Sequence, residues 1–189
     1  MNIDKEALFK DMTKIKDNFY ASSGKNVFQK NVQKEKIAET INSNFCLDDL
    51  MVNTVYLIPN TNCIFIDYLI FKMYAIPTNY ESIVNRLIEI MIRTINQYGS
   101  FQMHINLSSF TITALERFQD IFKLYYDSCI RRGLLYDPDI IDQIVIYNTP
   151  LIMSSISSMI IKFTEPSVRK KMVLHKKDVS EKLLCDLLE

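Results

Sequence analysis

Glycine is scarce in this sequence, and its scarcity excludes two classes of nucleotide-binding site. The 189 residues contain three glycines, at Gly24, Gly99 and Gly133. The motifs GxGxxG and GxxxxGK followed by Ser or Thr both need glycines a few residues apart, because the loop backbone must approach phosphate groups closely. These three positions cannot supply either motif. We therefore expect neither a dinucleotide-binding loop nor a P-loop.

Cysteine and histidine are too sparse and too dispersed for a metal centre. The four cysteines are Cys46, Cys63, Cys129 and Cys185; none of them forms a CxxC pair, and two histidines accompany them. Zinc sites in proteins use closely spaced Cys and His ligands. The sequence thus predicts no metal site and no cofactor. Reduced, mostly buried thiols are typical of a cytoplasmic protein.

An excess of one charge and long apolar runs are absent as well. Lys plus Arg and Asp plus Glu each total 22, so the formal net charge is zero and gives no reason to expect nucleic acid as a partner. No uncharged apolar run reaches the about 18 residues that indicate a membrane span. The stretch from Met1 to Tyr20 alternates charged and apolar residues, which is unlike a signal peptide.

The residues that could catalyse a reaction lack the sequence context of a catalytic site. His104 lies between Met103 and Ile105, which is typical of a hydrogen-bonded core histidine, with a general base as the alternative. Neither Ser108 nor Cys129 lies in a GxSxG elbow or a cysteine-nucleophile signature. We expect a protein that is not an enzyme.

Residues 1–50 have the pattern of a helical segment. The first helix is indicated by an N-cap candidate, Asp4, and by apolar residues at helical spacing: Leu8, Met12, Ile15 and Phe19. A second, shorter helix is expected from about Val32 to Asn42.

From residue 51 the pattern changes to strands alternating with helices. The expected strands are 54–58, 62–74, 101–107, 143–147 and 172–174, which are rich in β-branched and aromatic residues. The expected helices are 80–98, one that opens at Thr113 or Thr111 and continues to about 132, 151–163, and one that Asp178 caps. This order predicts an α/β fold with a mixed, mostly parallel five-stranded sheet covered by helices. We expect a single domain over 1–189, with 1–50 as its N-terminal helical segment and 51–189 as its core.

One acidic residue interrupts the second expected strand. Asp67 stands in the apolar run NCIFIDYLIFKMY. A carboxylate there either faces solvent on the pleat or holds a polar group of a ligand, and the sequence leaves both readings open.

The most specific stretch of the chain is 137–174. Asp137-Pro138-Asp139 is followed by an apolar strand ending in Asn148-Thr149-Pro150, by the apolar helix 151–163, by Glu165-Pro166, and by Arg169-Lys170-Lys171 before the last strand. This order and spacing resemble the CRAL-TRIO (Sec14-like) lipid-binding family, and the resemblance covers roughly Val55 to Leu187. It implies the family's α/β fold around an apolar ligand pocket.

The resemblance also implies a ligand site. Helix 151–163 matches the family's mobile gate over the pocket; a short helix that is apolar on nearly every side is otherwise simply core. Lys171 matches the family's headgroup-phosphate lysine, and Asp139 matches the acid of its Pro-acid turn. The expected ligand-binding residues are Lys171, Asp139, Tyr147, Met103, Ile105, Phe65, Met159 and Ile156.

Basic residues cluster near the end of the chain. The expected contacts with anionic headgroups are Arg169, Lys170, Lys176 and Lys177. Each Lys or Arg close to an anionic surface contributes about 1 kcal/mol to its attraction. A solvated basic face is the alternative interpretation.

Two functional hypotheses follow. The first is non-enzymatic binding or transfer of a small hydrophobic ligand or phospholipid by a cytoplasmic protein that touches anionic membranes transiently. The alternative is a ligand-free interaction module of the same fold, with a filled core and a protein partner.

Overall fold

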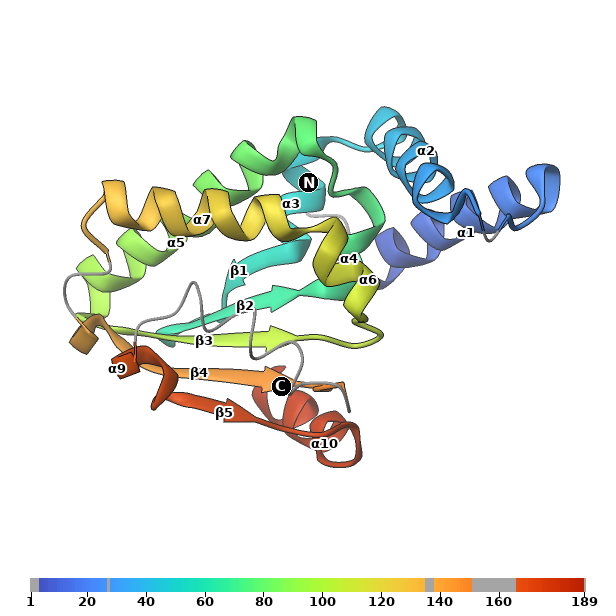
Figure 1. Cartoon of the computed structure of the whole chain (residues 1–189). Helices are drawn as coiled ribbons and strands as arrows, with labels where there is room; N and C mark the ends of the chain where they lie inside the picture. The colour runs from blue at the N-terminus through green and yellow to red at the C-terminus, as the bar shows by residue number, and fades with distance from the viewer. Residues whose placement is uncertain (1–3, 27, 135–137, 151–165, 189) are drawn as a thin grey trace.

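The computed structural model describes residues 4–26, 28–134, 138–150 and 166–188, and these contain a five-stranded sheet of order β1-β2-β3-β4-β5 (Figure 1). The strands are β1 (Val55–Leu57), β2 (Cys63–Asp67), β3 (Phe101–Asn106), β4 (Ile141–Tyr147) and β5 (Met172–Leu174). β1 runs antiparallel to β2, whereas the other three neighbouring pairs are parallel. The expected α/β class and mixed, mostly parallel sheet are confirmed.

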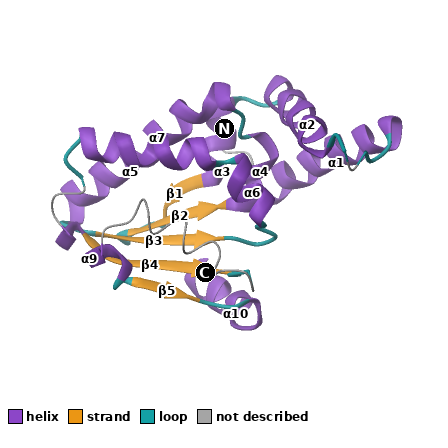
Figure 2. Ribbon diagram, in the orientation of Figure 1, coloured by secondary structure: helices purple, strands orange, loops and turns teal. Residues whose placement is uncertain are grey.

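Helices cover this sheet and lie in the connections between its parallel strands (Figure 2). The α-helices are α1 (Lys5–Ser23), α2 (Lys30–Asn44), α3 (Leu47–Thr54), α4 (Tyr68–Tyr74), α5 (Tyr80–Tyr98), α6 (Ile112–Arg117), α7 (Gln119–Arg131), α9 (Pro166–Arg169) and α10 (Lys177–Leu188). Two short 3-10 turns, η1 (Pro77–Asn79) and η2 (Pro138–Ile140), precede α5 and β4.

The helices α5 and α7 lie together over one face of the sheet (Figure 1). α5 connects β2 to β3, and α7 lies in the connection from β3 to β4. Parallel strand crossovers are right-handed in nearly all proteins, so two crossovers that advance in the same direction place their helices on the same face. α5 ends at Gly99, whose positive φ of 83° lets the chain leave the helix in the left-handed conformation.

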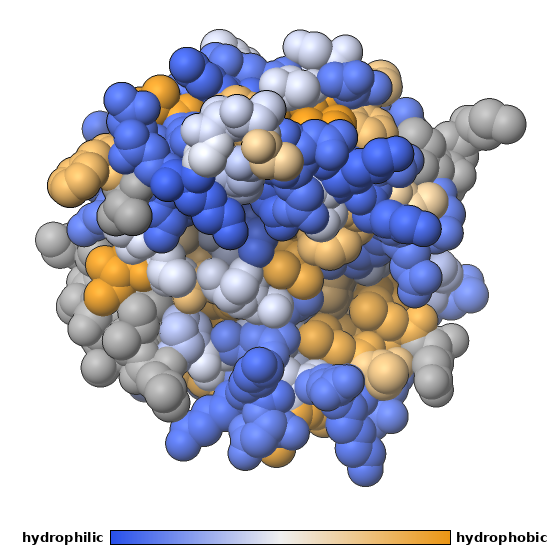
Figure 3. All heavy atoms as spheres, turned by 90° about the vertical axis from the view of Figure 1, so that its right-hand side faces the viewer, coloured by the Kyte–Doolittle hydropathy of each residue, from blue (hydrophilic) through white to orange (hydrophobic). Residues whose placement is uncertain are grey.

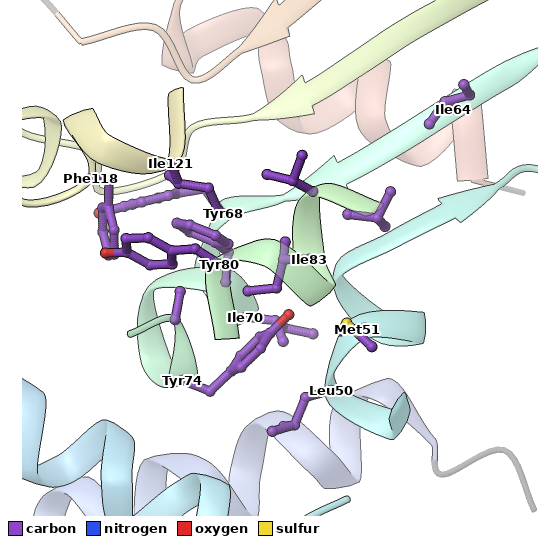
Figure 4. Close-up of a cluster of buried hydrophobic side chains, with 14 of the residues drawn as sticks. Leu50, Met51, Ile64, Tyr68, Ile70, Tyr74, Tyr80, Ile83, Phe118 and Ile121 are labelled. Atoms are coloured by element: carbon purple, nitrogen blue, oxygen red, sulfur yellow. The ribbon is translucent and has the colours of Figure 1, made fainter. Parts of the chain in front are cut away.

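The N-terminal helices pack against α4, beyond the carboxyl ends of the parallel strands (Figure 1). Asp4 caps α1 by accepting a hydrogen bond from the backbone N–H of Glu6, as the sequence predicts. Leu8 and Met12 of α1 are fully buried. Figure 4 shows part of the same core, where Leu50 of α3 lies below Tyr74 of α4.

The strand expected over 62–74 is wrong in its second half, which forms the helix α4. The change occurs at Asp67, whose carboxylate accepts a hydrogen bond from the backbone N–H of Leu69 at 2.9 Å and so caps the new helix. Asp67 is 5% exposed and pairs with Lys5 of α1 at 2.7 Å. The solvent-facing interpretation of this acid is therefore wrong, because the carboxylate is buried in a structural ion pair.

The helix expected over 113–132 is divided at Phe118 into α6 and α7. The ring of Phe118 is 1% exposed, and Thr111 caps α6 by accepting from the N–H of Ala114. The helix expected over 151–163 lies outside the described residues. Within the described ranges, we find no helix with both the length and the apolar character required to cross a membrane.

Candidate functional site

An apolar cavity of about 300 Å³ lies between the sheet and the helices α5 and α7. All five strands of the sheet contribute side chains, and most come from the three central strands, including Ile66, Met103, Ile105, Ile144 and Ile146. Side chains from both covering helices line the opposite side, including Val84, Leu87, Ile121, Phe122 and Tyr125. A volume of this size is at the lower end of the range for ligand pockets and about twice that of an engineered cavity that holds benzene.

The central strand shows that the helices do not fill this space. Ile105 lies in β3, the middle strand of the sheet, and yet its side chain is only half-buried. Ile66 and Ile144, which flank β3 on both sides, are also half-buried. In a close-packed protein the centre of a helix-covered sheet face is fully buried. The exposure of these three side chains therefore belongs to the cavity.

The chemistry of the cavity favours an apolar occupant. The described residues that line it include no charged side chain, and its polar groups are mainly tyrosines. Burial raises the pKa of Tyr68 to about 12, and burial also raises the pKa of Tyr125 well above its ordinary value. Both phenols thus stay protonated at neutral pH, and the Tyr125 hydroxyl donates to the sulfur of Met91 at 3.6 Å.

The predicted ligand residues Met103 and Ile105 line the cavity, whereas Phe65 and Tyr147 do not. Side chains alternate between the two faces of a sheet. Phe65 pairs in register with His104, and Tyr147 pairs with Asn106. The structure therefore places Phe65 and Tyr147 on the face opposite to the cavity.

That opposite face is closely packed. Phe65 is 1% exposed and its ring lies 5.3 Å from that of Tyr56. The hydroxyl of Tyr147 is 2.9 Å from Nδ1 of His104, and its ring stacks on that of His175. His104 is buried with no hydrogen-bond partner at Nε2, and burial lowers its pKa. The prediction of a core histidine agrees with this geometry.

The structure brings the predicted pair Lys171 and Asp139 together. Nζ of Lys171 lies 3.9 Å from a carboxylate oxygen of Asp139 and donates to the carbonyl of Ile141 at 2.7 Å. Ile141 and Met172 line the cavity. This pair therefore lies near one end of the cavity, where β4 and β5 begin.

The basic cluster predicted near the end of the chain is split by β5. Arg169 and Lys170 are exposed before the strand begins, and Lys176 and Lys177 are exposed after it ends. Since a strand advances about 3.3 Å per residue, the two groups occupy opposite ends of β5. Met159 and Ile156, the remaining predicted ligand residues, lie outside the described residues.

A second hollow of about 470 Å³ lies at the carboxyl ends of β3 and β4. Figure 3 views this side and shows a hydrophobic patch between hydrophilic surfaces. Leu69, Leu184 and Leu188 line the hollow together with Asn106 and Asn148, whose amides bond to each other at 2.9 Å. Because this hollow is more open and its amides are already paired, it is a weaker candidate than the cavity.

The described residues contain no group of three or more His, Cys, Asp or Glu side chains placed to hold a metal ion. Sequence reasoning named two of the sheet residues that line the cavity, Met103 and Ile105, and none of its helix residues. The wide apolar stripe of α5 includes the cavity residues Val84 and Leu87. However, an apolar stripe that fills a core and one that borders a cavity have the same helical period, so the sequence does not distinguish them.

Comparisons with known proteins detect similarity in structure but not in sequence. No model of a known protein family matches the chain, and no curated protein does. The crystal structure of Sfh5 resembles the chain with a TM-score of 0.52 at 12% sequence identity. The match covers 89% of this chain and 65% of the other, so the chain spans about two thirds of that protein's length. Sfh5 is a Sec14-family protein, so the chain has a Sec14-like fold.

Proposed function

We propose that this protein binds a small hydrophobic ligand or a phospholipid, without enzymatic activity, in the cavity between the sheet and helices α5 and α7. The observation that carries the proposal is the half-buried state of Ile105 at the centre of the sheet. The resemblance of 137–174 to the CRAL-TRIO family and the Sec14-like fold support it. In this proposal residues 1–50 and 51–189 act as one domain.

Hydrophobic burial supplies enough free energy for such binding. Each methylene removed from water contributes about 0.8 kcal/mol. The described wall offers no charged group and no metal site, so affinity comes from burial and from shape rather than from directed bonds. A hydrocarbon chain is the ligand that this wall fits best.

The finer parts of the proposal concern the entrance to the cavity. Helix 151–163 would act as its gate, with Ile156 and Met159 facing the ligand. Lys171 and Asp139 would hold a polar group at the end where β4 and β5 begin. Arg169 and Lys170 would face an anionic membrane surface while a lipid is exchanged.

Native mass spectrometry of the purified full chain tests this function, followed by organic extraction of any bound species. We expect a discrete added mass of lipid size and a matching molecule in the extract. A protein that carries no lipid and shields no added lipid from water would contradict the proposal. That outcome would favour the ligand-free interaction module.

A further inference from the structure

Basic side chains from four helices converge beside the cavity, away from Lys171. They are Lys16 of α1, Lys34 of α2, Lys72 of α4 and Arg117 of α6, and all four are half-buried. The ammonium of Lys34 is close enough to interact with the charges of Lys72 and Arg117. The ammonium of Lys72 also interacts with the charge of Lys16. We call Lys34, Lys72 and Arg117 the basic triad.

The triad is not neutralised by acids of the described chain. No carboxylate lies within ion-pair distance of its three cations in the described ranges. Two acids among the described residues act on the triad at longer range. Glu35, which acts on Arg117, is exposed. Asp67, which acts on Lys72, is already paired with Lys5. Arg117 donates to the carbonyl of Ala75 at 3.5 Å, which satisfies one donor but neutralises no charge. Half-buried like charges repel one another and lose hydration, so an anion that joined them would relieve this cost.

The pKa values of the triad reflect its burial, and the pKa of Lys34 also reflects the charges of the other two members. Burial lowers the pKa of Lys34, and the charges of Lys30, Arg117 and Lys72 lower it further. Burial is also the main cause that lowers the pKa of Lys72 and of Arg117. Groups perturbed together in this way are characteristic of binding sites.

Two members of the triad rest on the aromatic wall of the cavity. Nζ of Lys72 lies 5.7 Å from the centre of the Tyr68 ring, and Cζ of Arg117 lies 4.8 Å from the centre of the Phe118 ring. Both rings line the cavity, and their centroids are 6.2 Å apart. Figure 4 shows Tyr68 and Phe118 in the same cluster of buried side chains. The cations and the cavity therefore share the same rings.

From this juxtaposition we infer that Lys34, Lys72 and Arg117 bind the phosphate group of an anionic amphiphile whose hydrocarbon part occupies the cavity. This inference rests on the proposed function, because it assigns the polar end of the same ligand. It assigns the phosphate to the end of the cavity beside α4 and α6, and it leaves Lys171 for any further polar group of the ligand.

A phosphate monoester suits the triad in charge and in geometry. It carries up to two negative charges and three terminal oxygens, one for each cation. The planar guanidinium of Arg117 can contact two of these oxygens at once, while the lysines act as point charges. Lys72 also donates to the hydroxyl of Ser109, which adds a further polar group next to the triad.

Calorimetric titration of the full chain with three probes tests the inference. Dodecyl phosphate carries both parts of the ligand, dodecanol carries the tail alone, and inorganic phosphate carries the anion alone. We expect the wild-type protein to bind dodecyl phosphate roughly tenfold or more tightly than dodecanol, and to bind inorganic phosphate weakly. We expect this preference to shrink as salt concentration rises.

Substitutions that remove charge but preserve size show which residues cause the preference for dodecyl phosphate over dodecanol. In the K72Q/R117Q protein we expect dodecyl phosphate and dodecanol to bind with similar affinity, while the affinity for dodecanol stays at the wild-type value. The matched control, K10Q/K36Q, removes two exposed lysines of α1 and α2 and should keep the full preference. Thermal melts verify that each variant is folded.

Each contrary outcome is distinguishable. A preference that survives in K72Q/R117Q, or that disappears in K171Q instead, overturns the triad while the proposed function stands. Inorganic phosphate that binds as tightly as dodecyl phosphate overturns the amphiphile in favour of a free anion. If none of the three probes binds, the proposed function fails, and the inference fails with it.

Discussion

The two faces of the sheet are built from the same strands and yet differ in packing. On the face covered by α5 and α7, Ile105 is half-buried and borders a cavity. On the opposite face Phe65, His104 and Tyr147 are buried at 1%, 6% and 4% exposure, and polar contacts connect two of them. The comparison separates stability from function: the filled face stabilises the fold, and the hollow face leaves space for a ligand.

The largest expected effect comes from deleting one aromatic ring of the packed face, and a ring that borders the cavity gives the comparison. Phe65→Ala should lower the free energy of unfolding by about 3–5 kcal/mol, because it leaves a void in a filled face. Phe122→Ala, the same change at a cavity-lining ring that is 37% exposed, should cost about 1 kcal/mol. Urea unfolding of both variants measures the difference. Equal costs would contradict the contrast between the faces.

The next largest effect concerns Asp67, the buried acid of the filled face. Asp67→Ala removes the carboxylate that pairs with the ammonium of Lys5 and accepts from the N–H of Leu69 in α4, at a cost of about 2–3 kcal/mol. Asp17→Ala breaks an exposed pair with Lys16 and should change stability by about 0.5 kcal/mol or less. Chemical denaturation distinguishes the two. A small effect at Asp67 would show that the pair does not fasten α1 to the sheet.

Enlarging a side chain gives a smaller effect, and it should be tolerated on the cavity face but not on the packed face. Val145→Phe overfills the packed face and should cost about 1–3 kcal/mol. Ile105→Phe extends into the cavity and should leave stability within about 1 kcal/mol of the wild-type value. Thermal unfolding followed by circular dichroism provides the measurement. If Ile105→Phe were the more damaging variant, the space above β3 would not be a cavity.

The smallest effect is a pH dependence from His104. Burial holds the pKa of His104 in the folded protein below its ordinary value of 6.5, so the unfolded chain takes up the proton more readily. This contribution to stability is complete above pH 6.5 and is lost as the pH falls below that value. His104→Gln should therefore flatten the decline in unfolding free energy between about pH 6.5 and 5. Tyr147→Phe keeps the imidazole and should retain the decline; an unchanged slope in His104→Gln would be the contrary result.

The sequence predicted most of the fold, because its elements have strong local signals. Gly99 ends α5 at the expected residue, and β5 has its expected bounds. The α4 helix was not foreseen, because its apolar residues satisfy a strand pattern equally well and the N-cap role of Asp67 depends on its pairing with Lys5 across 62 positions.

The candidate site was predictable only in part. Neighbouring side chains in a strand lie on opposite faces of the sheet, so the sequence alone assigns Met103 and His104 to different faces. Assigning Phe65 and Tyr147 to one of these faces requires the register of β2 and β4 against β3. Register depends on long-range pairing, which a single sequence does not contain. The basic triad comes from three helices far apart in the chain and has no local signal at all.

A ligand titration with a cavity-filling variant tests the central claim most directly. Native mass spectra of the wild-type chain, of Ile105→Trp and of Ile130→Trp are recorded with increasing dodecanol. Ile130 is 39% exposed on α7 and does not line the cavity, so it is the matched control. We predict a one-to-one adduct for the wild-type and Ile130→Trp proteins and its loss in Ile105→Trp. An adduct that persists in folded Ile105→Trp, or one that never forms in the wild-type protein, would contradict a ligand cavity above β3.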